Sequence, residues 1–143
     1  MAPDFLDHLT QAKHNQDCAN RFLMISTDRD WAITAAFYAA LHFTLAGLIC
    51  KKIYSIPIGD ERSLHAAQSK KIKEIFGSIC YKDYQKLFFA SDKVRYIRDY
   101  SGISSNQIPS LNYFSQSDVN TFVKCSLPNI KQEIEKVTNA NFT

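Results

Sequence analysis

The sequence has few residues that interrupt helices or promote disorder, with only four glycines and four prolines among 143 residues. Apolar residues make up 45% of the chain and charged residues 22%. This balance is typical of a globular protein and excludes a disordered or low-complexity chain. A chain of this length fits one compact domain that buries about two-thirds of its unfolded surface. We therefore expect residues 1–143 to form a single domain.

Paired cysteines are absent as well. The four cysteines stand singly, without a Cys-x-x-Cys pair and without a histidine at metal-ligand spacing, at Cys18, Cys50, Cys80 and Cys125. This spacing excludes the common zinc motifs. Because each cysteine falls in or beside a predicted helix, we expect buried free thiols. We expect neither a metal ion nor another cofactor.

A secretory signal is not visible, because no basic segment precedes an apolar run at the start of the chain. Together with the unpaired cysteines, this predicts a cytoplasmic location. The formal net charge of +3 permits a nucleic-acid ligand without arguing for one, since dedicated nucleic-acid binders concentrate more basic charge on one face.

Charged residues are missing from one long stretch, the 20 residues Trp31–Cys50, which include six alanines. Alanine favours helix formation, so the sequence predicts a helix from about Arg29 to Tyr54. A helix that is apolar nearly all round must be surrounded by other helices or by lipid. Polar side chains in the middle of the stretch, such as His42, oppose a membrane span, and we expect no membrane partner.

Amphipathic periodicity predicts the remaining helices. They cover residues 4–25, 60–77, 78–98 and a segment from Ser115 or Ser117 to about Val137, which Pro128 kinks or restarts. Residues 99–114 are expected to form a loop, the lysines Lys70, Lys71 and Lys73 a solvated basic face, and the last six residues a frayed tail. The predicted fold is therefore all-α, an up-down four-helix bundle with a fifth, short or kinked helix.

Strong catalytic motifs are absent: the chain has no phosphate-binding Gly-rich loop, no His-Glu-x-x-His and no Gly-x-Ser-x-Gly. A constellation of polar residues remains on the predicted helices, namely Tyr38, His42, Arg62, His65, Arg95, Arg98 and Tyr100. Histidine titrates near neutrality and arginine binds phosphate in a fork, so this set is suited to RNA cleavage without a metal. A core histidine and a solvated helix start are the alternatives for His42 and for Arg62 with His65.

Four groups of residues carry a resemblance to a known superfamily. They are the run from Asp30-Trp31-Ala32 through Phe37-Tyr38-Ala39-Ala40-Leu41-His42, then Arg62 with His65, then Tyr84-x-x-Leu87, and Ser91-Asp92-Lys93-Val94-Arg95-Tyr96. In this order they resemble a branch of the HEPN superfamily of small helical bundles, over roughly residues 10–100. The resemblance implies a bundle of four to five helices, commonly a homodimer, in prokaryotic toxin–antitoxin, defence or RNA-processing systems.

The resemblance does not extend to the nuclease motif. Catalytic HEPN ribonucleases carry Arg-x4–6-His near the start of a late helix, whereas all four histidines here precede Arg95 and Arg98. We therefore expect a non-catalytic or weakly catalytic HEPN-like homodimer that binds a nucleotide, an RNA or a partner protein encoded nearby. The alternative is an atypical, metal-independent ribonuclease. It would use His42 and Arg95 as catalytic residues, with Tyr38, Arg62, His65, Tyr96 and Arg98 binding the nucleotide or RNA.

Overall fold

The computed structural model describes residues 2–56, 63–96 and 113–143. Within these ranges the protein is all-helical, with 84% helix and no strand. The helices are α1 (Phe5–Leu23), α2 (Arg29–Cys50), α3 (Leu64–Tyr96), α5 (Gln116–Thr121) and α6 (Leu127–Thr138), with a 3₁₀ turn η1 (Ser26–Asp28) and a π turn η2 (Phe122–Ser126). The predicted all-α class is therefore confirmed.

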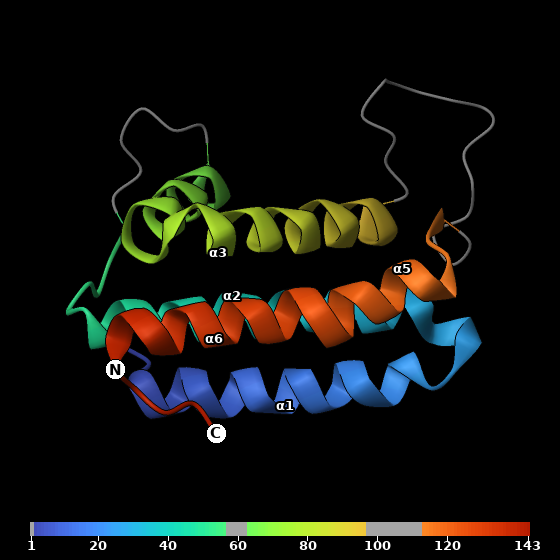
Figure 1. The fold of residues 1–143 in the computed structure, drawn as a ribbon, viewed down its shortest axis with the longest axis horizontal. Helices are drawn as coiled ribbons and strands as arrows, with labels where there is room; N and C mark the ends of the chain where they lie inside the picture. Colours follow the sequence, from blue (N-terminus) through green and yellow to red (C-terminus); the bar gives the residue numbers. More distant parts are fainter. Residues whose placement is uncertain (1, 57–62, 97–112) are drawn as a thin grey trace.

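Helix α2 lies at the centre of the helical bundle, in contact with α1, α3 and α6. Figure 1 shows α1 and α3 on opposite sides of the layer formed by α2 and α6. The alanines of α2 allow these neighbours to approach closely. At Gly47 an added Cβ would lie 2.5 Å from Cγ2 of Ile134 and 2.8 Å from Cζ of Phe76, so α6 and α3 both press against this point.

The central helix is shorter than predicted. It ends at Cys50 instead of Tyr54, because Lys52 adopts a left-handed conformation with φ of 60°. The turn is closed by two bonds, from the Lys52 N–H to the Ile49 carbonyl (2.8 Å) and from the Ile53 N–H to the Leu48 carbonyl (2.9 Å). These bonds satisfy carbonyl groups that a helix end leaves unpaired.

By length and composition, one segment in the described part of the chain, Ser26–Cys50, could cross a membrane. Buried residues make up 56% of its most apolar window, as in the core helix of a bundle. The expected burial on all sides is wrong at the two ends of the stretch, because the Trp31 side chain at the start of α2 is 58% exposed and Cys50 at its end is also exposed.

Helix α3 is broken at Gly77, as the sequence predicted. Gly77 has φ of 94° and ψ of 174°, a conformation that is almost restricted to glycine. The two halves, residues 64–76 and 78–96, therefore point in different directions (Figure 1). Residues 60–62 and 97–98, which were assigned to the ends of these helices, lie outside the described residues.

The chain from α5 through η2 to α6 is continuous, and Ser115 is its N-cap, one of the two predicted residues. Its hydroxyl accepts a bond from the Asp118 N–H (3.1 Å), and the Asp118 carboxylate accepts one from the Ser115 N–H (3.2 Å). Pro128 lies in the first turn of α6, directly after the π turn. The wider turn accommodates a residue that has no N–H to donate, so the helix neither breaks nor restarts.

The last residues are not frayed. Phe142 is fully buried, and its ring stacks on Phe43 with centroids 5.9 Å apart and contacts Phe5 at 5.7 Å. The Phe142 N–H donates to the Glu135 carboxylate at 3.2 Å. The expectation was wrong because a single aromatic residue in a polar tail has no periodicity that would reveal a core contact.

The expectation of buried thiols holds for one cysteine of four. Cys80 is buried, and burial raises the pKa of its thiol to about 12. Cys50 and Cys125 are exposed and Cys18 is partly exposed, all as free thiols. A cysteine near a helix end can face solvent on an otherwise apolar helix, which the sequence pattern did not distinguish.

Candidate functional site

Two of the predicted site residues meet between α2 and α3. The guanidinium of Arg95 donates from Nη1 to the Tyr38 hydroxyl at 2.9 Å. Its Nε donates to the Ser91 hydroxyl at 3.0 Å, one turn earlier on α3. These bonds fix the arginine along the α2–α3 contact, so Arg95 continues the inward stripe of its helix, as its spacing predicted.

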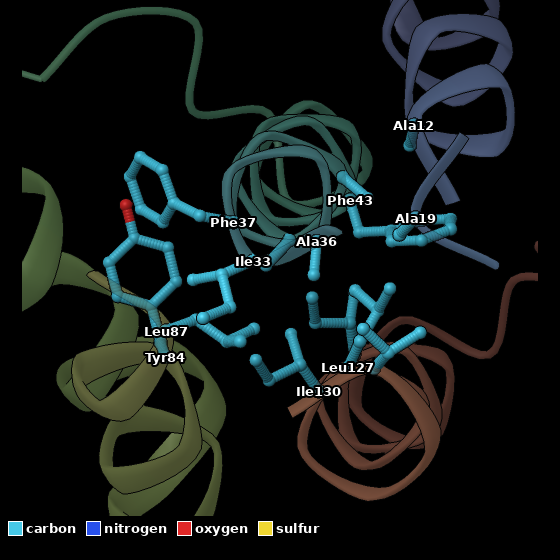
Figure 2. Packing of buried hydrophobic residues seen from close by; sticks show 14 of the residues in the cluster. Ala12, Ala19, Ile33, Ala36, Phe37, Phe43, Tyr84, Leu87, Leu127 and Ile130 are labelled. Atoms are coloured by element: carbon cyan, nitrogen blue, oxygen red, sulfur yellow. The ribbon is translucent and has the colours of Figure 1, made fainter. Parts of the chain in front are cut away.

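An aromatic cluster lies next to this arginine. The Phe37 ring contacts Tyr84 (5.8 Å between centroids) and Phe88 (5.7 Å), and the Arg95 guanidinium carbon lies 5.7 Å from the Phe37 centroid. Figure 2 shows Phe37 and Tyr84 facing each other between α2 and α3. The imidazole of His65 packs on Phe88 at 5.1 Å. The His65 ring also lies 6.3 Å from the Phe37 ring, so Arg95 and His65 share Phe37 as a neighbour.

His42 has a different partner. Its Nδ1 lies 3.0 Å from Nδ1 of His8 in α1, and the two rings are tilted by 32°. Burial lowers the pKa of both imidazoles below the usual range, and for His42 the neighbouring His8 lowers the pKa further. Both rings are therefore mostly neutral at pH 7, with one nitrogen of the pair donating and the other accepting.

The surroundings of this histidine pair are apolar. His8 lines a cavity of about 220 Å³ between the start of α1, the end of α2 and the start of α3. Most of its other lining residues are aliphatic, for example Leu45, Leu48 and Ile53. Such walls offer little compensation to a phosphate group, which would lose its hydration on entry.

The structure therefore divides the predicted site. It brings Tyr38 and Arg95 together and places His65 on the adjoining aromatic cluster, whereas His42 pairs with α1. Neither His42 nor Arg95 lines any of the three cavities described here. The predicted residues Arg62 and Arg98 lie outside the described residues, as does the side chain of Tyr96.

A groove of about 430 Å³ lies between the two halves of α3, on either side of the break at Gly77. We call it the α3 groove. It is lined by Ser63, His65, Ala66, Ser69, Lys70, Lys73, Tyr81, Gln85, Phe88 and Phe89. The ammonium of Lys73 lies 5.3 Å from the centre of the Tyr81 ring. The Phe89 side chain is 51% exposed although it is large and apolar.

Most of the groove residues were not predicted as a site. Lys70 and Lys73 were assigned to a solvated basic face, and only His65 was a candidate ligand-binding residue. Gly77 was the informative signal, since a positive-φ break sets the lysine face of one half opposite the aromatic face of the other. The direction of that turn cannot be derived from periodicity alone.

A metal site does not arise from these groups. In the part of the chain that the structure describes, no cluster of three or more His, Cys, Asp or Glu side chains could hold a metal ion.

Comparison of the chain with protein-family models, with curated proteins and with solved structures finds no significant match in any of the three. The case for a function therefore depends on the geometry of the site.

Proposed function

We propose that this protein is a HEPN-like, up-down helical bundle that binds RNA or a nucleotide in the α3 groove, in the cytoplasm and in a toxin–antitoxin or defence system. In this proposal it catalyses no reaction or only a weak one. The observation that carries the proposal is the combination of two lysines with three aromatic side chains in one groove, Lys70, Lys73, Tyr81, Phe88 and Phe89. The alternation of chain direction between successive long helices in Figure 1 supports the up-down arrangement.

The chemistry of the groove matches the two parts of a nucleotide. Lysine ammonium groups bind phosphate as point charges, and aromatic rings stack on bases without regard to sequence. Gln85 and Ser69 add hydrogen-bonding groups that suit base edges or ribose hydroxyls. None of the described residues that line the groove is acidic, so this part of the lining places no carboxylate against the phosphate.

The direct test is binding of labelled RNA in solution, followed by fluorescence anisotropy. We expect the wild-type protein to bind and Lys73→Gln and Tyr81→Ala to weaken binding, each by about five-fold or more. Lys13→Gln on α1, on the opposite side of the bundle, is the matched charge control and should bind as the wild type does. Absence of RNA and nucleotide binding by the folded wild-type protein would refute the proposal.

The ribonuclease remains the alternative function. One observation favours it: a neutral imidazole within hydrogen-bond distance of a second one, as at His8 and His42, is able to accept a proton. RNA cleavage is measured with EDTA present for the wild type, His42→Ala and Arg95→Ala. If the wild type cleaves RNA and either substitution abolishes cleavage, the ribonuclease hypothesis is supported. If the RNA stays intact with the wild type, that hypothesis is refuted.

Self-association is also part of the proposal. Large apolar side chains are exposed around the turn between α1 and α2, including Met24 at 85%, Trp31 at 58% and Ile25 at 48%. Exposed apolar side chains gathered in one place are typical of an interaction surface. Light scattering after size-exclusion chromatography should give the mass of a homodimer, and the double substitution Met24→Ser with Trp31→Ser should shift it toward the monomer. A monomeric wild type would exclude the dimer.

A further inference from the structure

The α3 groove shares one lining residue, Phe89, with a second hollow. This hollow has a volume of about 320 Å³ and is lined by Lys86, Phe89, Ala90, Lys93, Tyr113, Phe114 and Phe122. We call it the Lys93 hollow. Phe89 lines both cavities, so one exposed aromatic ring separates them.

The Lys93 hollow repeats the chemistry of the α3 groove. The ammonium of Lys93 lies 4.2 Å from the centre of the Tyr113 ring, as Lys73 lies over Tyr81 in the groove. Lys86 adds a second positive charge, which the Asp83 carboxylate approaches at 3.6 Å. Asp83 is buried and does not line the hollow. Each cavity therefore offers two lysines and exposed or half-buried aromatic rings.

We propose that the two cavities form one track for a single-stranded nucleic acid, which crosses Phe89 and places bases and phosphates in both. This inference rests on the proposed function and extends it from a nucleotide-sized ligand to an oligonucleotide. A duplex is disfavoured, because bases stack on protein aromatic rings only when they are unstacked from their own partners. The shared chemistry suits RNA and DNA alike.

The length of the track sets the size of the ligand. The track follows the second half of α3 from Tyr81 to Lys93, a span of 12 residue steps and about 18 Å at the rise of an α-helix. Stacked nucleotides are spaced by about 3.4 Å along one strand. The track thus accommodates about five stacked nucleotides, or fewer in an extended strand. A mononucleotide fills only one of the two cavities.

The experiment is a length series. Binding of uridine monophosphate and of oligouridylates of two, four, six and eight nucleotides is measured by competition against a labelled octamer, together with an oligothymidylate octamer and a matched RNA duplex. We expect affinity to rise steeply up to about five nucleotides and to change little beyond that. The duplex should compete poorly.

Substitutions divide the track into its parts. Phe89→Ala should lower the affinity for the octamer by about five-fold or more. Lys93→Gln should lower the affinity for the octamer and leave the affinity for the mononucleotide unchanged. It should also reduce the magnitude of the slope of log affinity against log salt concentration by about 0.7. The matched control is Tyr54→Ala, since Tyr54 is an exposed aromatic residue outside both cavities. This substitution should change the affinity neither for the octamer nor for the mononucleotide. Circular dichroism of each variant confirms its fold.

The failure of the inference differs from the failure of the proposed function. If mononucleotide and octamer bind equally and Lys93→Gln has no effect, the track is refuted while nucleotide binding in the α3 groove stands. If no nucleic acid binds, both are refuted. Tighter binding of the duplex than of either single strand would also overturn the track. If the wild-type protein binds an acidic peptide of matched length but no oligonucleotide, the basic surface serves a protein partner and the inference is wrong.

Discussion

The two sides of the central helix differ in how completely they are closed. Toward α1 and α6 the buried side chains are small or aliphatic, such as Ala12 and Ala19 of α1 and Leu127 and Ile130 of α6 (Figure 2), and Phe142 is fully buried at the end of the chain. Toward α3 the contacts are aromatic and mixed with polar groups, and the hairpin of α3 leaves cavities on its outer face. We therefore expect the first side to contribute most to stability, and the proposed ligand binding uses the second side.

The largest expected effect is on the closed side. Phe142→Ala should lower the free energy of unfolding by about 3–5 kcal/mol, because it empties a fully buried aromatic site between Phe43 and Phe5. Urea denaturation measures the loss, with the exposed neighbour Asn141→Ala as the control. A loss no greater than that of the control would show that the tail does not contribute to the core in solution.

The second effect tests the hairpin of α3. Gly77→Ala should cost about 1–3 kcal/mol, because alanine is strained at φ of 94° although an added Cβ would meet no atom within 4 Å. It should also weaken RNA binding, since the angle between the two halves of α3 shapes the groove. Ser78→Ala, one residue later and also exposed, controls for the change in side chain. Equal stability of the two variants would contradict the observed backbone conformation.

Two tyrosines on the α3 side should respond in opposite directions. Tyr84 is fully buried and its hydroxyl has no hydrogen-bond partner in the described part of the chain, so Tyr84→Phe should raise the free energy of unfolding by about 1 kcal/mol. Tyr38→Phe removes the acceptor of the Arg95 bond and should lower it by about 1 kcal/mol. Thermal denaturation of both variants checks the signs. Destabilisation by both would indicate that the Tyr84 hydroxyl is bonded.

The smallest effect is a pH dependence on the α1 side. Because burial holds the pKa of His8 and of His42 below the value of an unfolded chain, folding favours their neutral forms. Their contribution is complete above about pH 6.5 and is lost as the pH falls below it, an effect that Asp4 and Asp7 moderate at His8. Urea midpoints at pH 7.5 and 5.5 should differ more for the wild type than for the double variant His8→Asn with His42→Asn. An equal difference in urea midpoint for the wild type and the double variant would contradict this prediction. The control variant is His14→Asn, which should behave as the wild type does.

The sequence was sufficient for the elements that depend on local rules. The uncharged, alanine-rich segment predicted α2, Gly77 predicted the break in α3, and Ser115 was one of two predicted caps. The predictions failed where a contact between distant segments decides the outcome. Phe142 is anchored by α1 and α2, and the early end of α2 depends on a left-handed Lys52.

The candidate site shows the same limit. The periodicity of α3 correctly predicted that Arg95 points inward. No pattern indicated that Tyr38 would accept its hydrogen bond or that His42 would pair with His8. These pairings depend on the rotation of each helix about its axis. The basic face of α3 was predicted from the sequence, whereas Tyr81 and Phe89 opposite it were not, and the turn at Gly77 brings them into one groove.

That turn makes the groove a product of a single continuous piece of chain, residues 63–89. Its opposing walls are joined through one residue, so the spacing between them is set by Gly77 rather than by the docking of remote helices. A change within this short piece can widen, narrow or recharge the groove while the contacts of α1 with α2 stay as they are. For the proposed function, variation in ligand preference can thus arise here without a matching change in the rest of the molecule.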